Sequence, residues 1–402
     1  MRLRRGGIVA FAMALASGCG PSVSPVQNGY SAPTDALTAS PSGSAAPGTP
    51  TPRLPDKSPT PAPSGPTCAL PVSTWTPWQL AGAVILAPAR LDDLAAAGPM
   101  VAAGVGGVVL FGSPRGEVRA QLRHLHAAAG AWPLLVASDE EGGGIQRLAA
   151  LTGALPWPRD LSARGPAAIR TAAATMGRAL RALTVRIGLA PVADLDAGPG
   201  PDASHPDGKR SFSADPATAS ADVVAFARGL LDAGIVPVVK HYPGLGTASA
   251  NTDAAAAVTA PLSTLRQRDL LPFAAAIRAG IPAVMTSNAV VPGLSPLPVS
   301  LSAAATRLLR DTLGFRGAII TDSLSAGAIS AAGFGLGPAT VRALSAGADG
   351  VIIGRGDSTN GAALASSVRT SIVAAVGVGR LPIARLREAV RRLAALMGTA
   401  TC

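Results

Sequence analysis

The 402-residue chain is poor in aromatic residues, cysteines and lysines. Aromatic residues make up 3% of the sequence, so the core must be mainly aliphatic and a long cleft lined with stacking rings is disfavoured. Charged residues make up 14% and hydrophobic residues 48%, a balance that excludes intrinsic disorder for most of the chain. The length fits one or two domains.

The formal net charge of +11 does not by itself indicate nucleic-acid binding. The basic residues are scattered, and the one dense cluster, in residues 380–392, is interpreted as the solvated face of the last helix. The chain also lacks an HExxH motif, clustered His or Cys residues, and a glycine-rich phosphate loop followed by lysine. We therefore predict no metal, no cofactor and no nucleic-acid partner.

The N-terminus has the pattern of an export signal. Residues 1–19 begin with basic residues, continue with an apolar run too short to span a bilayer, and end in ALASGC. This ending resembles the lipobox of bacterial lipoproteins, in which Cys19 becomes the lipidated N-terminal residue. We expect residues 1–18 to be removed and the protein to be anchored by lipid to the outer face of the bacterial cell membrane. A secretory signal that is simply cleaved is the alternative.

Residues 19–66 are rich in Pro, Ser, Thr and Gly and are predicted to form a disordered tether. The folded domain is expected to span residues 67–402. Of the three cysteines, Cys68 and Cys402 stand at the two ends of this domain. Because the termini of compact domains often lie close together and an exported protein meets oxidising conditions, we predict a disulfide between these two residues. Two unpaired thiols are the alternative.

Apolar runs alternate with stretches of helical length along the domain. The runs lack the polar alternation of a half-exposed sheet, so they are predicted to be buried parallel strands. Eight such strands, each followed by a helix, predict an α/β fold of the (β/α)8 TIM-barrel type, with a doubly wound open sheet as the alternative. The predicted strands cover residues 80–88, 105–112, 133–139, 187–194, 235–242, 281–288, 317–323 and 348–354.

Polar residues end several of these strands. In a barrel, the carboxyl ends of the strands form one rim, where active sites lie. Lys240 is notable because lysine is rare beside arginine in this chain, which suggests a position that needs a compact ammonium group. The residues expected on the rim are Asp139, Asp194, Lys240, His241, Ser287, Asn288 and Asp322.

Five motifs at or near these strand ends resemble glycoside hydrolase family 3, and most of all its single-domain bacterial β-N-acetylglucosaminidases. The resemblance covers about residues 75–396. The motifs are SDEEGGGIQRL (138–148), APVADLD (190–196), GKRSFSADP (208–216), VVKHYPGLG (238–246) and ITDSLSAGAI (320–329).

The resemblance implies a retaining β-glycosidase, and the scarcity of aromatic residues fits an exo-acting enzyme with a pocket for one sugar. The resemblance places the nucleophile, which would form a glycosyl ester, at Asp322. It also implies that Asp139, Arg210, Lys240 and His241 hold the hydroxyl groups of one sugar, a role that suits a carboxylate and cationic donors. An exported protein meets cell-wall sugars, so the expected substrate is a β-N-acetylhexosaminide derived from peptidoglycan, with β-glucosides or β-xylosides as alternatives.

The sequence departs from the family pattern where the acid/base histidine is expected. Leu245 stands in place of a histidine, and the usual Asp-Ser-His triplet reads Asn251, Thr252 and Asp253. Gly144 stands where an arginine is usual. The loop therefore contains no histidine to protonate the leaving group.

Three interpretations of this change remain open. Asp253 serves as the catalytic acid/base, since a carboxylic acid with a raised pKa can do this work. Alternatively, the acid is Glu140, Glu141 or His205. In the third interpretation, the protein binds sugar on the cell surface without efficient turnover. A Schiff-base aldolase acting through Lys240 is a further, disfavoured alternative.

Overall fold

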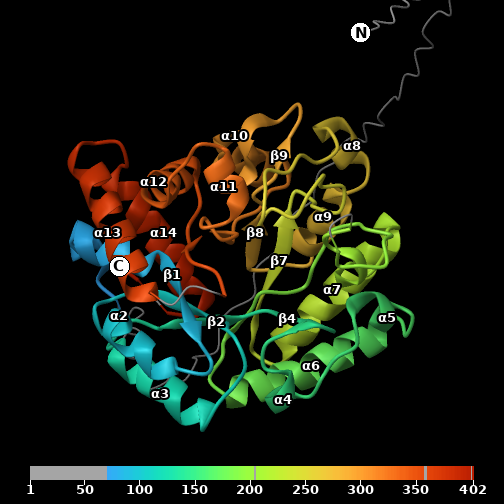
Figure 1. Cartoon of the computed structure of the whole chain (residues 1–402), viewed down its shortest axis with the longest axis horizontal. Helices are drawn as coiled ribbons and strands as arrows, with labels where there is room; N and C mark the ends of the chain where they lie inside the picture. The colour runs from blue at the N-terminus through green and yellow to red at the C-terminus, as the bar shows by residue number, and fades with distance from the viewer. Residues whose placement is uncertain (1–69, 203–204, 357–359, 400) are drawn as a thin grey trace, which may run out of the picture. The chain divides into compact units, whose positions relative to one another are not determined.

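Eight parallel strands form the centre of the computed structural model, which describes residues 70–202, 205–356, 360–399 and 401–402 (Figure 1). Their spatial order is β11-β8-β7-β6-β3-β2-β1-β12. A parallel bridge between Ile320 and Gly350 joins the two outer strands and closes the barrel. The predicted TIM-barrel fold is confirmed. The strands are β1 (Ile85–Arg90), β2 (Gly107–Phe111), β3 (Leu135–Ser138), β6 (Ile187–Gly188), β7 (Val236–Tyr242), β8 (Ala283–Thr286), β11 (Ala318–Thr321) and β12 (Val351–Ile352).

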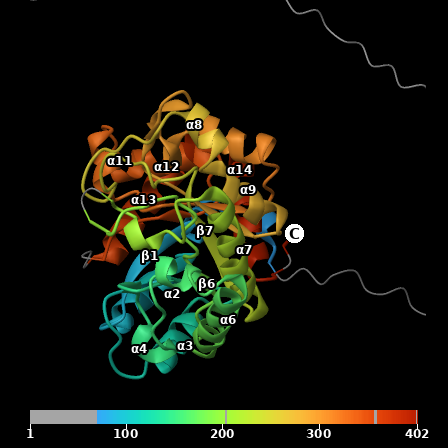
Figure 2. The same cartoon turned by 90° about the vertical axis from the view of Figure 1, so that its right-hand side faces the viewer.

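Helices surround the strands, as Figures 1 and 2 show. Their inward faces supply buried aliphatic residues to the core, in agreement with the scarcity of aromatic residues. The helices are α1 (Pro77–Ala83), α2 (Gly98–Ala102), α3 (Val118–Ala128), α4 (Ala149–Thr152), α5 (Pro158–Ser162), α6 (Pro166–Ala182), α7 (Pro216–Asp232), α8 (Leu262–Gln267), α9 (Leu270–Arg278), α10 (Ala303–Arg307), α11 (Gly327–Ala331), α12 (Leu336–Ala346), α13 (Gly361–Gly377) and α14 (Ile383–Leu396). No helix within the described residues is long and apolar enough to cross a membrane.

Two short hairpins lie outside the barrel sheet and were not predicted. One pairs β4 (Glu140–Gly142) with β5 (Ile145–Gln146), directly after β3. The other pairs β9 (Val290–Val291) with β10 (Ser295–Pro298), after β8. Both extend from the carboxyl ends of barrel strands, where they add walls to the rim.

The first predicted strand was wrong at its start. Residues 80–83 complete helix α1 instead of forming a strand. Thr76 and Gln79 form a reciprocal capping box, and Pro77 occupies the first helical position, so the local sequence begins a helix before the apolar run. Strand β1 then starts at Ile85 and continues past the predicted end to Arg90.

The two ends of the described domain lie side by side. Leu70 forms a parallel bridge with Thr401, and the amide of Cys402 donates to the carbonyl of Leu70 at 3.0 Å. Cys402 is disulfide-bonded. Cys68, its predicted partner, lies outside the described residues, as do Cys19, the predicted signal and the predicted tether.

The arginine cluster of the last helix is only partly a solvated face. Arg385 and Arg392 of α14 and Arg310 all form ion pairs with Asp349, which is fully buried. The interpretation from sequence was therefore wrong for Arg385 and Arg392. A buried carboxylate neutralises these guanidinium groups beneath the helix.

Candidate active site

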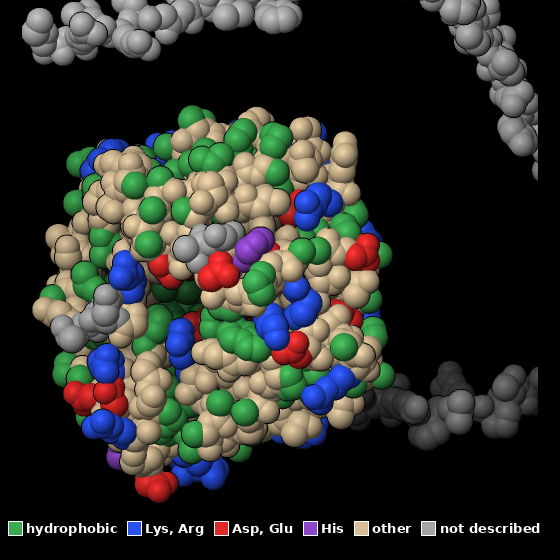
Figure 3. Space-filling view, turned by 45° about the vertical axis from the view of Figure 1, so that its right-hand side comes forward, with side chains coloured by type: hydrophobic (Ala, Val, Ile, Leu, Met, Phe, Trp, Pro, Cys, Tyr) green, Lys and Arg blue, Asp and Glu red, His purple; other side chains and the backbone are tan. Residues whose placement is uncertain are grey.

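A cavity of about 580 Å³ opens at the carboxyl ends of the barrel strands. Figure 3 shows a hollow bordered by acidic and basic side chains. This cavity is lined by the predicted nucleophile Asp322, the acid/base candidate Asp253 and the predicted sugar-binding residues Asp139, Arg210, Lys240 and His241. Of the alternative acids, Glu141 lines the cavity and Glu140 and His205 do not.

Lys240 forms the centre of a buried charge cluster. Its Nζ lies 2.7 Å from Oδ1 of Asp139 and 2.6 Å from Oε1 of Glu141. Burial lowers the pKa of Lys240, but the attraction of the two carboxylates outweighs burial and leaves the pKa above its ordinary value. A Schiff-base lysine needs the opposite shift, so the cluster argues against the aldolase alternative.

Glu141 is bound from two sides, a role that the sequence analysis did not assign to it. Arg210 holds its carboxylate with two hydrogen bonds, of 2.8 Å from Nε and 3.0 Å from an Nη atom. Burial alone would raise the pKa of Glu141, but Arg210 and Lys240 lower it far below its ordinary value. Glu141 is therefore ionised and cannot serve as a catalytic acid.

Glu140, the neighbouring candidate acid, points away from the cavity. Its Oε1 accepts hydrogen bonds from the Ser138 hydroxyl at 2.6 Å and the Leu148 amide at 3.1 Å. Burial raises the pKa of Glu140 to about 7, so it can hold a proton near neutral pH. However, it does not line the cavity and cannot reach a sugar bound there.

His205 likewise fails as the acid. Its Nδ1 lies 3.0 Å from Oδ1 of Asp196, and His205 does not line the cavity. Asp196 also accepts hydrogen bonds from the amides of Gly198 and Gly208. These contacts hold together the loop that supplies Pro201 and Pro206 to the cavity wall.

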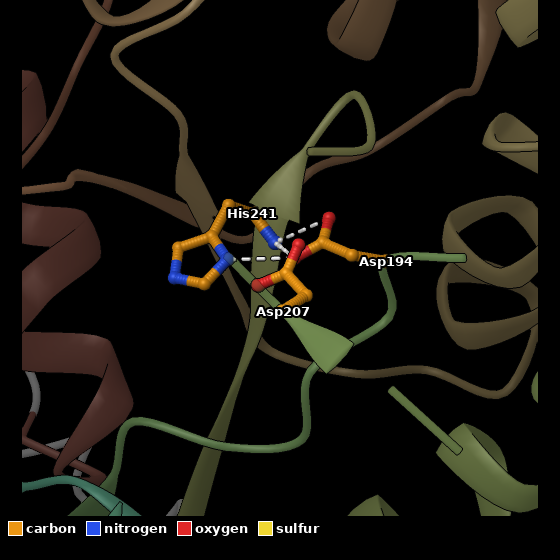
Figure 4. Close-up of side chains that lie close together, drawn as sticks. All are labelled: Asp194, Asp207 and His241. Carbon is orange, nitrogen blue, oxygen red and sulfur yellow. Dashed lines mark hydrogen bonds and ion pairs between the residues drawn. The ribbon is translucent and has the colours of Figure 1, made fainter. Parts of the chain in front are cut away.

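His241 is oriented by Asp194, as Figure 4 shows. The Nδ1 atom lies 2.7 Å from Oδ2 of Asp194, which also accepts a hydrogen bond from the His241 amide, while Oδ1 of Asp194 accepts one from the Leu245 amide. Burial and the nearby Arg210 and Lys240 lower the pKa of His241, so the ring is neutral at pH 7. With Nδ1 donating to Asp194, Nε2 is left as an acceptor for a sugar hydroxyl.

Asp194, Asp207 and His241 also bring metal-ligand atoms within 4.8 Å of one another. The chemistry of the site does not favour a cation. Asp194 and His241 already hydrogen-bond to each other, and one oxygen of Asp207 accepts from Arg210 at 2.9 Å. Burial and repulsion by Asp194 raise the pKa of Asp207 to about 7. We therefore expect Asp207 to reduce its negative charge by holding a proton beside the Arg210 guanidinium, and not by binding a cation.

Asp322 follows β11 and faces the cavity. One carboxylate oxygen accepts a hydrogen bond from the amide of Ser323 at 2.7 Å. Burial raises the pKa of Asp322, and repulsion by Asp253 adds to this rise. Asp253 is thus close enough for its charge to act on the predicted nucleophile.

The loop that carries Asp253 is fixed by its backbone. The Asp253 carbonyl accepts hydrogen bonds from the Gly327 amide at 2.9 Å and from Arg355 at 3.1 Å. The Thr252 carbonyl accepts from the Ala328 amide at 3.0 Å. The Asp253 side chain is exposed at the cavity edge. These contacts tie the loop to the start of α11, a few residues after Asp322, and to Arg355.

Trp157 lies beside Gly144, in the space that a side chain at this position would need. A Cβ atom at Gly144 would lie 3.2 Å from the indole, and one at Gly143 would lie 2.0 Å from it. The ring therefore occupies the space beside both glycines, so an arginine at position 144 requires Trp157 to move. Nothing in the local sequence pairs Trp157 with these glycines.

Arg147 is a further cationic residue of the cavity that sequence reasoning missed. It lies 3.4 Å from Oδ2 of Asp139 and places its guanidinium 5.8 Å from the ring centroid of Phe111. Its position in the SDEEGGGIQRL motif was visible in the sequence, but the motif alone did not show that the β4–β5 hairpin folds back over Asp139.

Comparisons with known proteins agree on one family. Residues 95–396 match the family described as "Glycosyl hydrolase family 3 N terminal domain". The Mycobacterium tuberculosis protein named beta-hexosaminidase LpqI is 39% identical over 57% of this chain and 60% of its own length. The match therefore spans about 60% of that relative. A beta-hexosaminidase of Xylella fastidiosa is 38% identical over 68% of this chain and 83% of its own length.

Solved structures support the same comparison. The structure of M. tuberculosis LpqI has a TM-score of 0.74 and 33% identity, covering 83% of this chain and 98% of that chain. A beta-N-acetylhexosaminidase from Beutenbergia cavernae has a TM-score of 0.73 and 31% identity, covering 81% of this chain and 99% of that chain.

Proposed function

Because this chain belongs to glycosyl hydrolase family 3, we propose that it is a retaining, exo-acting β-N-acetylhexosaminidase. The observation that carries the proposal is the position of Asp322 in the same cavity as the buried cluster of Asp139, Glu141, Arg210 and Lys240. A nucleophilic carboxylate and a rigid set of polar groups for one sugar are what retaining hydrolysis needs. The beta-hexosaminidase relatives suggest the substrate class.

In the first step, an ionised Asp322 oxygen attacks the anomeric carbon while the bond to the leaving-group oxygen breaks. The Ser323 amide holds one Asp322 oxygen and directs the carboxylate. Asp253 gives its proton to the leaving-group oxygen, so an alcohol departs and an ester to Asp322 remains. In the second step, Asp253 takes a proton from a water molecule while the water oxygen attacks the anomeric carbon. The bond to Asp322 breaks, so Asp322 returns as a carboxylate and Asp253 as a carboxylic acid.

The charge cluster provides the sugar clamp. Lys240 and Arg147 can donate to sugar hydroxyls, and Asp139 and the Nε2 atom of His241 can accept from them. Asp194 and Glu141 act indirectly, since they orient His241 and Lys240. Fixed partners keep these side chains in place before substrate arrives, which lowers the ordering cost of binding.

The proposed substrate is a β-N-acetylhexosaminide released from the cell wall. The basis is the names of the relatives together with the predicted lipoprotein signal and Cys19. A Cys19→Ala variant tests the anchor: the wild type should partition into detergent and carry lipid on Cys19, whereas the variant should not. Recovery of unlipidated wild-type protein from the medium would support a simply cleaved signal instead.

Sugar binding without turnover is the second candidate function. The observation that favours it is the acid/base loop. Among the described residues that line the cavity, His241 is the one histidine, and Asp194 already holds its ring. If Asp253 does not transfer protons, the clamp and Asp322 would bind a sugar and release it unchanged.

The test is turnover of 4-nitrophenyl β-glycosides of N-acetylglucosamine, glucose and xylose by the full chain. An aryl leaving group needs little protonation, so a weak acid/base does not hide a working nucleophile. We expect nitrophenol from the N-acetylglucosaminide, abolished in Asp322→Asn and retained in the control Asp311→Asn, whose side chain is exposed. No release from any glycoside by folded protein, together with sugar binding in calorimetry, would favour the second function.

A further inference from the structure

Another cavity, of about 460 Å³ and lined by three arginines, lies at the opposite end of the barrel from the candidate active site. Leu134 directly precedes β3 and Arg186 directly precedes β6, so this cavity opens where strands begin. Arg123 and Arg181 also line it. The amino-terminal face of a barrel usually serves stability, so an arginine-lined cavity at this position needs a separate explanation.

The cavity gathers positive charge without an acidic partner. No Asp or Glu is among its lining residues, and none lies within ion-pair distance of Arg123, Arg181 or Arg186 in the described part of the chain. Burial lowers the pKa of the Arg186 guanidinium, and repulsion by Arg181 lowers it further. Arg181 donates a hydrogen bond to the Gly234 carbonyl at 3.3 Å, but the described protein supplies no counter-charge to either cation.

Other crowded arginines in this protein are neutralised. Arg310, Arg385 and Arg392 converge on the buried Asp349. Arg210 is held by Glu141 and Asp207. Arg369, which is also buried, has no carboxylate partner but donates to the carbonyls of Trp78 and Ala103, whereas Nε of Arg186 has no acceptor.

Two buried donors in the cavity also lack partners. Nε of Arg186 and Oγ1 of Thr184 are buried and make no hydrogen bond. Thr184 lies just after α6 with a φ of 69°, a conformation unusual for a β-branched residue. Its carbonyl oxygen accepts from Nε2 of His126 at 3.1 Å, so the backbone is held in place while the hydroxyl stays unused. Buried polar groups normally find a partner, and here a bound group would supply it.

We propose that this cavity binds a phosphate group, either as the free ion or as a small phosphate monoester. The guanidinium groups of Arg123, Arg181 and Arg186 provide charge and forked donors that match phosphate oxygens. The Thr184 hydroxyl can donate another hydrogen bond. A dianion neutralises the cationic cluster more fully than a carboxylate does. Leu134 and Met397 line the same cavity and leave an apolar wall for the organic part of an ester.

Calorimetric titration of the full chain with inorganic phosphate tests the proposal, against sodium chloride of equal ionic strength so that general screening is separated from binding. We expect one site per chain and a rise in melting temperature with phosphate concentration. Arg181→Gln and Arg186→Gln should each weaken binding about tenfold or more. Arg178→Gln is the matched control, because Arg178 is exposed on the same helix, α6, and does not line the cavity.

A second variant and a set of alternative ligands complete the test. If Arg186→Gln does not fold, Arg186→Lys keeps the charge and removes the planar fork, and it should still weaken phosphate binding. Glycerol 1-phosphate and vesicles of phosphatidylglycerol or phosphatidylcholine identify the source of the phosphate. Binding of both soluble ligands supports the proposed site, and hydrolysis of 4-nitrophenyl β-N-acetylglucosaminide should be equal in wild type and Arg181→Gln.

The proposal is overturned if phosphate neither binds nor raises the melting temperature of the wild type. It is also overturned if Arg178→Gln weakens binding as much as Arg181→Gln, since the effect is then one of overall charge. Binding to phosphatidylglycerol vesicles without binding to either soluble phosphate would likewise replace the proposed pocket by a membrane-facing charged surface.

Discussion

The Nζ atom of Lys240 and the Oε1 atom of Glu141 lie 2.6 Å apart, and both residues are almost fully buried. Glu141 also receives two hydrogen bonds from Arg210, so one carboxylate orients two cations of the sugar clamp. A buried charge stabilises a site only when its partners are all present, and removal of one partner leaves the others desolvated and unpaired.

Glu141→Gln should therefore lower both stability and activity. In this variant Lys240 still forms an ion pair with Asp139, and Arg210 still forms one with Asp207. We therefore expect the free energy of unfolding to fall by about 3 kcal/mol, and we do not expect complete unfolding. Hydrolysis should fall at least about tenfold because the clamp loses its orientation. Urea unfolding and kcat/KM measure the two effects. Asp160→Asn, which removes the exposed partner of Lys209, is the control and should change neither.

Glu140 should make stability fall as pH rises. Burial raises its pKa in the folded protein from 4.5 to about 7, so between these values the folded state holds a proton that the unfolded state has lost. Glu140→Gln keeps an acceptor for Ser138 and Leu148 but does not titrate. The variant should gain stability relative to wild type as pH rises from about 5 to about 7, by at most about 3 kcal/mol.

Urea unfolding of the wild type and of Glu140→Gln at the two pH values measures this difference. Using the difference between the proteins removes the contributions of Asp194 and Asp207, whose raised pKa values act in the same direction in both. A difference that does not change with pH would mean that Glu140 is ionised in the folded protein throughout this range.

The barrel could be predicted from the sequence because each strand is a separate apolar run. Parallel strands covered by helices need no polar alternation, so length and composition identified all eight. The bounds were less accurate: β1 begins and ends later than predicted, and β6 and β12 are much shorter than predicted. The capping box at Thr76 was local information that the apolar run concealed. The polar strand ends then placed Asp139, Lys240, His241 and Asp322 together.

Side-chain direction could not be predicted in the same way. Glu140 and Glu141 are adjacent in the sequence, yet one enters the core and the other the cavity, because β4 alternates its faces. The match of Trp157 to Gly143 and Gly144 depends on contacts across a turn. Asp207 is buried by a loop whose composition predicts exposure.

Cys402→Ser should destabilise the domain. Cys402 is disulfide-bonded, and its predicted partner is Cys68. Loss of a bond that joins the two ends of a domain should cost about 2–5 kcal/mol, chiefly because the unfolded chain gains freedom. Thermal unfolding with and without reductant measures the loss. Reductant should destabilise the wild type and leave Cys402→Ser unchanged.

Peptide mapping under non-reducing conditions identifies the partner of Cys402 directly. Cys19→Ser is the matched control, since it removes the one remaining cysteine and should leave unfolding unchanged. A peptide that links Cys402 to Cys19 would contradict both the predicted pairing and the predicted lipidation of Cys19.

Asp253→Ala should separate substrates by their leaving groups. A dinitrophenolate departs without a proton, whereas a sugar or alkyl alkoxide does not, so loss of the acid should slow the first step about 10²–10⁴-fold only for poor leaving groups. With dinitrophenyl glycosides, ester formation on Asp322 should stay fast and hydrolysis of the ester should become limiting. A burst of dinitrophenolate measured by stopped flow would show this change.

The control for Asp253→Ala is Asp311→Ala, which alters an exposed carboxylate and should affect neither substrate class. Asp253→Glu should restore part of the rate on alkyl glycosides, because it returns a carboxyl group to the same loop. Equal losses on aryl and alkyl substrates would contradict proton transfer by Asp253. Asp253 would then act electrostatically, since its charge raises the pKa of Asp322. Removal of Asp253 would lower the pKa of Asp322 and shift the acid limb of the pH profile to lower pH.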